Sequence, residues 1–380
     1  MKTLRFMIVA GEASGDGHAA KLVDAIREII PDGNVEFFGS AGPRMRGAGV
    51  AATVKADDLS IVGVAEIGRA LPMFMRTMKT LKAVAAEKQP DVAILVDFPD
   101  FNLKLAKHLK KQGIKVVYYI SPQLWAWRRY RLSTVKKYVD LMLTILPFEK
   151  DWYAEHGVTH IEYVGSPLAN EVHADRTKEQ FCFARGLDPL KTIITLLPGS
   201  RHKEIVRILP VMLEAAEKLA SDHVDAQFVI AIGSAKQRKD IDQFLLGSHL
   251  NITVVENETY DALNASDAAA VTSGTATLET GIIGTPQVIV YKTSAINYNL
   301  LKPLIDVPHY GLINLIAGER LVKELIQSDF TAQTLADEIN RLLQPDVNSE
   351  MRVRLKETAG KLGHGGASKR AAKAILNVVG

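Results

Sequence analysis

An acidic segment follows a very apolar run and has the composition of a catalytic loop. Asp97 comes directly after the run Val92–Val96, and Asp100 and Asn102 follow it. A carboxylate at the carboxyl end of a buried strand can act as a general base, because partial burial raises its pKa. Alternatively, Asp100 or Asn102 only caps the helix expected over Leu103–Lys111. Asp97 is therefore the favoured candidate base.

A glycine-rich segment after the first apolar run could bind an anion. Residues 11–18 read Gly-Glu-Ala-Ser-Gly-Asp-Gly-His and precede a helix expected to begin near Ala19. The backbone N–H groups of such a turn, here at Ser14, Gly15 and Asp16, can approach a phosphate. The alternative is a tight turn capped by Ser14 or Asp16. The segment has neither the GxGxxG pattern nor the lysine of a P-loop.

A similar segment opens the second half of the chain. Leu197–Arg201 follows an apolar run and precedes the helix expected over Glu204–Leu219. Ser200 and Arg201 lie where backbone amides and a guanidinium group can bind phosphate.

A third segment, residues 273–279, suits the ribose of a nucleotide. It places small residues and hydroxyl groups at the start of a helix, with a carboxylate about one turn later. These residues are Ser273, Gly274, Thr275 and Glu279. A carboxylate at this position can accept hydrogen bonds from both ribose hydroxyls. A phosphate-binding loop and a ribose-binding carboxylate in one half of the chain together indicate a nucleotide diphosphate.

Two other segments have more than one interpretation. Residues 121–129 contain two tryptophans followed by Arg128 and Arg129, which could line a sugar or an acyl chain; the residues alone favour a buried corner with surface arginines. Leu59–Lys82 has a helical apolar stripe that is wider than a core-facing helix needs, flanked by cations. This composition favours a helix in a membrane interface over one packed only on a sheet.

Short apolar runs alternate with helical segments along the whole chain, which predicts parallel sheets in an α/β fold. The expected strands are Leu4–Ala10, Val35–Gly39, Val92–Val96, Lys115–Ile120, Leu141–Leu146, Thr192–Leu197, Gln227–Ile232, Ile252–Val255, Ala268–Val271 and Gln287–Tyr291. The two series predict two doubly wound domains, over residues 1–168 and 169–365, joined by a hinge at residues 165–170. A C-terminal helix over residues 366–380 could rejoin the first domain.

Composition restricts the class of protein. The 380 residues carry a net charge of +3, with 47% hydrophobic and 23% charged residues, as in an ordinary globular protein. The near-balance of charge gives no reason to expect nucleic acid as a partner. Cys182, the single cysteine, cannot form an internal disulfide and is expected in packing. No metal site is expected, because His156 and His160 form only a weak pair. The apolar N-terminus is interpreted as a strand, and the protein as cytoplasmic.

Together these segments resemble the lipid-A-disaccharide synthases, glycosyltransferases that join two diacylated glucosamine units in outer-membrane biogenesis. The resemblance covers essentially the whole chain. It rests on the segments 11–16, 41–45, 97–102, 121–127, 146–149, 196–201, 273–279 and 312–318. It implies a GT-B fold, in which two Rossmann-like domains face each other across a cleft.

The resemblance also implies the reaction. The C-terminal domain would bind the UDP of UDP-2,3-diacylglucosamine, and the N-terminal domain would bind 2,3-diacylglucosamine 1-phosphate (lipid X). The α-linked donor becomes a β-1,6 linkage, so the mechanism would be inverting, without a metal or cofactor. Leu59–Lys82 corresponds to the family's membrane-contacting region, which implies a peripheral position on the inner membrane.

Site roles follow from the matching motifs. Asp97 would be the base, Arg201 would neutralise the departing diphosphate, and Glu279 would hold the ribose. Asn314 and Gln327 fall in motifs similar to the family's nucleotide-side loops. Asp97, Arg201, Glu279 and Asn314 lie in the matching segments given above.

Some questions stay open at this stage. Asp100, as a neighbour, and Glu12, from across the cleft, are alternative catalytic carboxylates. Gly165-Ser166-Pro167 stands where relatives usually have Gly-His-Pro, so no histidine role is transferred there. The alternatives for function are another GT-B UDP-N-acetylglucosamine transferase, a 2-epimerase, or a non-catalytic binder. The sequence allows a monomer or a homodimer.

Overall fold

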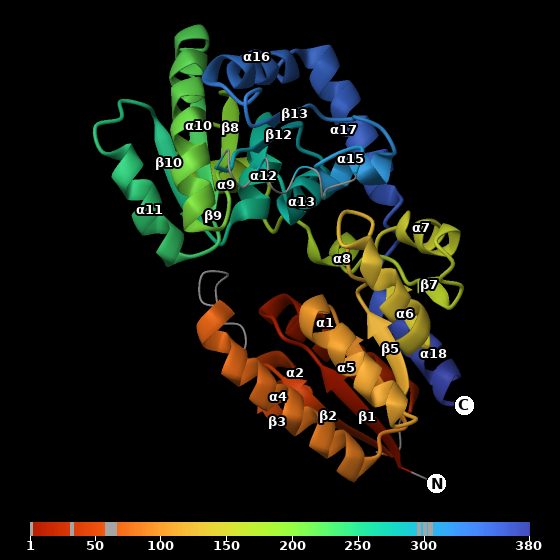
Figure 1. The fold of residues 1–380 in the computed structure, drawn as a ribbon. Helices are drawn as coiled ribbons and strands as arrows, with labels where there is room; N and C mark the ends of the chain where they lie inside the picture. Colours follow the sequence, from red (N-terminus) through yellow and green to blue (C-terminus); the bar gives the residue numbers. More distant parts are fainter. Residues whose placement is uncertain (1–2, 31–33, 58–66, 295–297, 299–301, 303–306) are drawn as a thin grey trace. The chain divides into compact units, whose positions relative to one another are not determined.

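The computed structural model describes residues 3–30, 34–57, 67–294, 298, 302 and 307–380. These residues form two compact α/β units, which are described separately (Figure 1). Unit 1 comprises Met1–Pro167 and His364–Gly380, and unit 2 comprises Leu168–Gly363.

Unit 1 is built on a parallel sheet of seven strands in the order β3-β2-β1-β4-β5-β6-β7. The strands are β1 Leu4–Val9, β2 Val35–Ala41, β3 Ala51–Lys55, β4 Val92–Val96, β5 Lys115–Tyr119, β6 Leu141–Thr144 and β7 Ile161–Tyr163. β4 is buried along its whole length. Its continuous run of apolar residues follows from helices covering both faces of the sheet.

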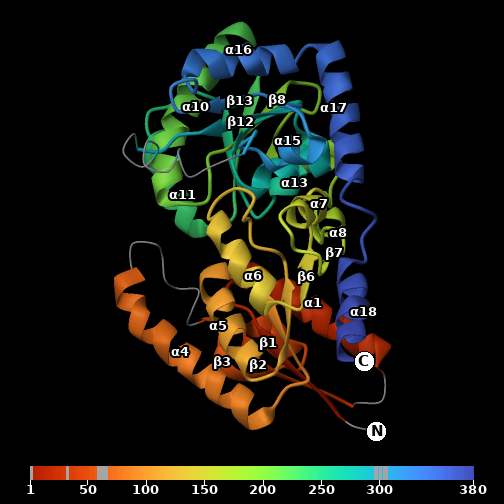
Figure 2. The same ribbon diagram turned by 45° about the vertical axis from the view of Figure 1, so that its right-hand side comes forward.

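The helices of unit 1 divide the core into two layers. They are α1 Ala13–Ile29, α2 Pro43–Gly47, α4 Ile67–Lys88, α5 Pro99–Lys111, α6 Leu132–Tyr138, α7 Glu149–Glu155 and α18 Ala367–Val379. Phe6 and Ile8 of β1 pack in one layer with α1 and α18, whereas Met7 and Val9 pack in the other with α4 and α5. This division follows from the alternation of side chains along a strand. The C-terminal helix α18 packs against α1, in the N-terminal part of the chain (Figure 2).

Unit 2 has a parallel sheet of six strands in the order β10-β9-β8-β11-β12-β13. The strands are β8 Ile193–Leu197, β9 Gln227–Ile232, β10 Ile252–Glu256, β11 Ala268–Thr272, β12 Gln287–Tyr291 and β13 Glu324–Ile326. The helices are α8 Leu168–Glu171, α9 Lys178–Arg185, α10 His202–Asp222, α11 Ala235–Leu245, α12 Thr259–Ala265, α13 Thr275–Ile283, α15 Leu312–Ala317, α16 Ala332–Leu342 and α17 Pro345–Gly360. Cys182, on α9, is fully buried in a core cluster that also contains residues of α12.

The expected strands are confirmed to within one or two residues at either end. The structure adds β3, β7 and β13, which the sequence analysis missed. β3 is half-exposed and lacks a continuous apolar run, while β7 and β13 are only three residues long. Each lies at the edge of its sheet, where a short and partly polar strand is sufficient.

Candidate active site

Each sheet has a point at which the strand order reverses, and predicted site residues follow the strands on either side of it. In unit 1 this point lies between β1 and β4, and in unit 2 between β8 and β11. Ligands of doubly wound sheets bind at the carboxyl ends of the strands beside this point. The loops after these four strands are therefore the candidate site loops.

Asp97 lies immediately after β4 in a strained backbone conformation. Asp97 and Phe98 have left-handed φ angles of 46° and 50°, which cost free energy for residues other than glycine. The Phe98 ring occupies the space beside Gly11, where an added Cβ would lie 2.4 Å from the ring atom Cδ1. Such strain persists only where the surrounding structure enforces it, and it clusters at functional sites.

The carboxyl group of Asp97 has the electrostatic environment of a general base. Its pKa is raised from 3.8 to about 6, first by burial and second by the Glu12 carboxylate, against opposing effects of the Phe98 N–H and His18. Glu12 itself is exposed at the N-cap of α1. A carboxyl group with this pKa is mostly ionised at neutral pH and still basic enough to accept a proton. The structure thus brings two of the predicted carboxylates, Asp97 and Glu12, into electrostatic contact.

Asp100 has a different environment, although it is only three residues away. Its side chain is exposed and accepts hydrogen bonds from Nη1 of Arg128 at 2.8 and 3.0 Å, and it also pairs with Arg131. Arg128 in turn lies over the Trp127 ring, with Cζ 4.0 Å from the ring centroid. Asp100 therefore fastens the segment after β5 to the start of α5. This geometry favours Asp97 over Asp100 as the base.

The expected helix start near Ala19 is wrong. α1 begins at Ala13, so Ser14, Gly15 and Asp16 form its first turn and not a preceding loop. Although the glycines have the composition of a loop, Gly15 is buried in this helical turn and lies beside Ala10 of the preceding strand end. Here a small residue serves close packing of the helix on the sheet.

Asp16 is committed to the backbone of the next loop. Its buried carboxylate accepts hydrogen bonds from the N–H groups of Gly42, Arg44 and Met45 at 2.8, 2.9 and 3.2 Å. An added Cβ on Gly42 would lie 2.5 Å from Cγ of Asp16, which explains the glycine. Asp16 therefore caps α2 and joins the two glycine-rich segments, whereas Ser14 stays exposed.

In unit 2, the loop after β8 is organised around a carboxylate. Backbone N–H groups of Ser200 and Arg201 donate to Oε2 of Glu204 at 3.0 and 3.2 Å, and Nη1 of Arg201 donates to Oε1 at 2.7 Å. Gly199 adopts a φ of 108°, and a Cβ there would collide with Glu204. The Arg201 side chain is 78% exposed. This convergence of amides and a guanidinium on one anion is the donor set that binds phosphate.

The loop after β11 is connected to the loop after β8 by a hydrogen bond. The Thr272 hydroxyl donates to the Leu197 carbonyl at 2.8 Å, across the ends of β11 and β8. Ser273 donates to the carbonyl of Tyr310, while Gly274 and Thr275 are exposed at the start of α13. Burial raises the pKa of the Glu279 carboxyl, and a hydrogen bond from the Tyr260 hydroxyl opposes the shift. Tyr260 was not anticipated from the sequence.

Comparison with known proteins decides the family. The sequence model of the family described as Lipid-A-disaccharide synthetase matches residues 6–378. The chain belongs to this family. It is 44% identical over 376 residues to the lipid-A-disaccharide synthase of Myxococcus xanthus, covering 99% of this chain and 97% of that protein.

Solved structures with low sequence identity share the fold. The UDP-GlcNAc 2-epimerase of Neisseria meningitidis bound to UDP-GlcNAc superposes with a TM-score of 0.59 at 14% identity, over 99% of this chain and 100% of that one. MurG of Acinetobacter baumannii superposes with a TM-score of 0.56 at 13% identity, with the same coverage. The expected GT-B fold class, with its two parallel-sheet α/β domains, is confirmed.

Two of the site residues predicted from the resemblance to the lipid-A-disaccharide synthases form hydrogen bonds within unit 2. The amide of Asn314 is buried, donates to Glu324 and the Val322 carbonyl, and accepts from the Val322 N–H. The amide of Gln327 exchanges two hydrogen bonds with the backbone of Thr293. Both side chains therefore shape loops near the ends of β12 and β13. A direct contact of either with the nucleotide stays a prediction.

The sequence analysis missed a buried carboxyl group in a motif of this family. Glu149 is fully buried, and it accepts hydrogen bonds from Nε1 of Trp125 at 3.0 Å and from the Leu146 N–H at 3.1 Å. Its pKa is raised from 4.5 to about 7, and burial is the main cause of this rise. The buried corner that the residues alone favoured is therefore present around Trp125, whereas Trp127 is 41% exposed. The sequence signal that could have revealed Glu149 is a glutamate that begins a helix shortly after a strand.

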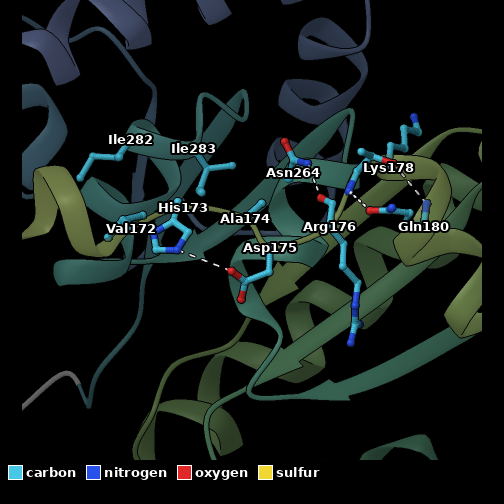
Figure 3. Close-up of a pocket in the computed structure, with 11 residues that line it drawn as sticks. Val172, His173, Ala174, Asp175, Arg176, Lys178, Gln180, Asn264, Ile282 and Ile283 are labelled. Carbon is cyan, nitrogen blue, oxygen red and sulfur yellow. Dashed lines mark hydrogen bonds and ion pairs between the residues drawn. The ribbon is translucent and has the colours of Figure 1, made fainter.

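A cavity of about 670 Å³ in unit 2 contains none of the predicted site residues. Its lining groups contact one another instead (Figure 3): His173 pairs with Asp175, and Asn264 donates to the carbonyl of Arg176. A smaller cavity of about 410 Å³ in unit 1 lies against Glu12, Asp16 and Arg44, beside the start of α1. Of these two cavities, only the smaller one is lined by predicted site residues, Glu12 and Asp16.

The described part of the amphipathic segment is helix α4. Residues 59–66 lie outside the described residues. Beyond these, Leu71 and Met75 are 57% and 66% exposed, while Leu81 is buried in the core. Within the described residues, no helix combines the length and apolar character that crossing a bilayer requires.

Proposed function

We propose that this protein is a lipid-A-disaccharide synthase, which transfers diacylglucosamine from UDP-2,3-diacylglucosamine to the 6-hydroxyl of 2,3-diacylglucosamine 1-phosphate. The observation that carries this proposal is the family match over residues 6–378. The environment of Asp97 supports it, because the reaction needs one base for one hydroxyl proton.

The proposed mechanism is a single displacement with inversion. The acceptor oxygen forms a bond to the anomeric carbon as the bond from that carbon to the diphosphate oxygen breaks. Asp97 takes the proton of the acceptor hydroxyl, and UDP leaves with the electron pair of the broken bond. Arg201 and the amides after β8 stabilise the charge that develops on the diphosphate.

We assign the acceptor and the membrane contact to unit 1, and the donor to unit 2. The unit 1 assignment is supported by Asp97 and by the exposed apolar residues of α4. The phosphate-type donor set around Arg201, together with Glu279, supports the unit 2 assignment. Both substrates carry acyl chains, so an enzyme at the cytoplasmic surface of the inner membrane can reach them.

Turnover with defined substrates tests the function. Purified protein in detergent is expected to convert the two diacylated substrates into the β-1,6-linked disaccharide 1-phosphate and UDP, as followed by mass spectrometry. UDP-N-acetylglucosamine, which lacks the acyl chains, is the control and is expected to stay unchanged. Its epimerisation or its use as a donor, without product from the lipids, would favour the alternative GT-B activities.

Membrane contact can be tested on α4. The double variant Leu71→Ser/Met75→Ser is expected to lose most of its binding to anionic phospholipid vesicles, because burial of each large apolar side chain contributes about 1.5–3 kcal/mol. Co-sedimentation measures the bound fraction. The matched control is Phe183→Ser/Leu190→Ser, which removes two apolar side chains of unit 2 that are more than 90% exposed. Equal loss in both variants would contradict a specific role for α4.

A further inference from the structure

The main-chain carbonyl of Asp97 is held by two side chains from other elements. The Tyr118 hydroxyl donates to this oxygen at 2.6 Å, and Nδ2 of Asn102 donates to it at 2.8 Å. Nδ2 of Asn102 also donates to the carbonyl of Val96 at 3.1 Å. Both donors are neutral side chains, and both hydrogen bonds are made to the main-chain oxygen of Asp97.

The two donors are rigidly placed. Tyr118 belongs to β5, which pairs with β4, and its side chain is fully buried. Asn102 is also fully buried, in the first turn of α5. The N–H of Asp97 donates to the Tyr119 carbonyl at 2.9 Å and so continues the ladder between the two strands. The backbone of Asp97 is therefore held at its N–H by the sheet and at its carbonyl by the two side chains.

The strain at this point needs such restraints. Left-handed φ angles at two consecutive residues other than glycine are strained, and they persist only where the surrounding structure enforces them. A relaxed backbone would redirect the Asp97 side chain. Near-attack geometry is sensitive to shifts of this kind, and a displacement of about 1 Å can reduce a rate 100-fold.

We propose that Tyr118 and Asn102 are positioning residues for the base, which act by holding the Asp97 carbonyl and thereby aim its carboxyl group at the acceptor. This inference rests on the proposed function, in which Asp97 takes the acceptor proton. It goes further by naming the groups that keep the base in its strained, reactive orientation.

The environment of the carboxyl group provides a readout. Glu12 and His18 of the α1 region face it, as does Tyr118 of β5. The main cause of its raised pKa is burial, with Glu12 second. When the restraint is removed, the carboxyl group becomes more hydrated and its pKa falls toward the ordinary value.

Two tyrosine variants test the proposal directly. Tyr153, like Tyr118, is a buried tyrosine of unit 1 whose hydroxyl donates to a main-chain carbonyl at 2.6 Å, in this case that of Pro122. Tyr118→Phe is expected to lower kcat about 10–100-fold with little change in the KM of either substrate. Tyr153→Phe removes an equivalent hydrogen bond and is expected to retain the wild-type kcat. Asn102→Asp, which replaces the donor by an acceptor, is expected to show the same kcat loss as Tyr118→Phe.

A second measurement does not depend on turnover. The Asp97 carboxyl carbon can be titrated by ¹³C NMR with labelled aspartate, after assignment with Asp97→Asn. Tyr118→Phe is expected to lower the pKa of this group, and Tyr153→Phe to leave it unchanged. Equal kcat losses in the two tyrosine variants, or an unchanged Asp97 titration in Tyr118→Phe, would overturn the proposal. Failure of the wild type to form product, with the shifted titration still present, would reject the proposed function alone.

Discussion

The Asp97→Asn variant is expected to form disaccharide roughly 10²–10⁴-fold more slowly than the wild type, the usual contribution of a positioned general base. Asparagine has nearly the same shape and tolerates the left-handed φ of 46° at this position, so the variant removes the basic oxygen with little strain. Its affinity for UDP is expected to equal that of the wild type, because the proposed donor loops belong to unit 2. Initial rates in detergent and calorimetric titration with UDP measure the two quantities.

Asp100→Asn is the matched control for this prediction. It removes a carboxylate three residues away that pairs with Arg128 and Arg131. A surface pair of this kind contributes about 0–1 kcal/mol, so only a small effect on turnover is expected. Turnover that survives in Asp97→Asn and disappears in Asp100→Asn would assign the base to Asp100.

The pH dependence follows from the same group. A base must be deprotonated, and the pKa of Asp97 is raised to about 6. The value of kcat/KM is therefore expected to fall as the pH drops below about 6, and to reach a plateau above it. Glu12→Gln removes a negative charge that raises this pKa, so its acid limb is expected at a lower pH. An acid limb that does not move in Glu12→Gln would contradict the electrostatic coupling of the two carboxylates.

The Arg201→Gln variant is expected to bind UDP roughly 10–100-fold more weakly, because a hydrogen bond from a charged group contributes about 1.5–3 kcal/mol. The loss is expected to be larger at low ionic strength, where the charge is less screened. The variant also leaves the Glu204 carboxylate in the loop without its guanidinium partner, which adds repulsion toward a diphosphate. Calorimetric titration with UDP at two salt concentrations measures both effects.

Arg207→Gln is the control for charge alone. Arg207 lies on α10, the helix that begins directly after Arg201. Its guanidinium group donates to the carbonyl of Lys203. Its replacement changes the net charge equally and is expected to leave UDP affinity within about twofold of the wild type, as for surface charges in general. A similar loss of affinity in both arginine variants would mean that general electrostatic attraction, and not the phosphate loop, binds the nucleotide.

Much of the candidate site could be predicted because it lies at strand ends. Asp97 and Arg201 each follow an apolar run, and such runs are visible without any knowledge of the fold. The start of α1 could not be predicted equally well. Gly15 and Gly17 have the composition of a turn, and their burial under neighbouring segments depends on contacts that are distant in sequence.

The roles of the acidic residues show the same limit more clearly. Asp16, Asp97, Asp100 and Glu149 all follow or begin regular elements, and their sequence contexts look alike. In the structure, the Asp16 carboxylate accepts hydrogen bonds from three backbone N–H groups. Asp100 accepts them from two arginines, and Glu149 accepts one from Trp125. Asp97 has a raised pKa, because burial and the neighbouring Glu12 carboxylate outweigh the opposing effects of the Phe98 N–H and His18.

The sequence by itself determined the family, the α/β class and ten strands, because apolar runs, helical periods and motif order are local properties of the chain. It also placed the candidate carboxylates at the ends of strands. Only the tertiary structure decided the environment of each carboxylate: whether it is buried, whether it already accepts hydrogen bonds from the protein, and whether its backbone is held in a strained conformation. The physical reason is that the charge near Asp97 comes from Glu12 and a hydrogen bond to its carbonyl comes from Tyr118, and only the order of strands β1, β4 and β5 brings these groups together.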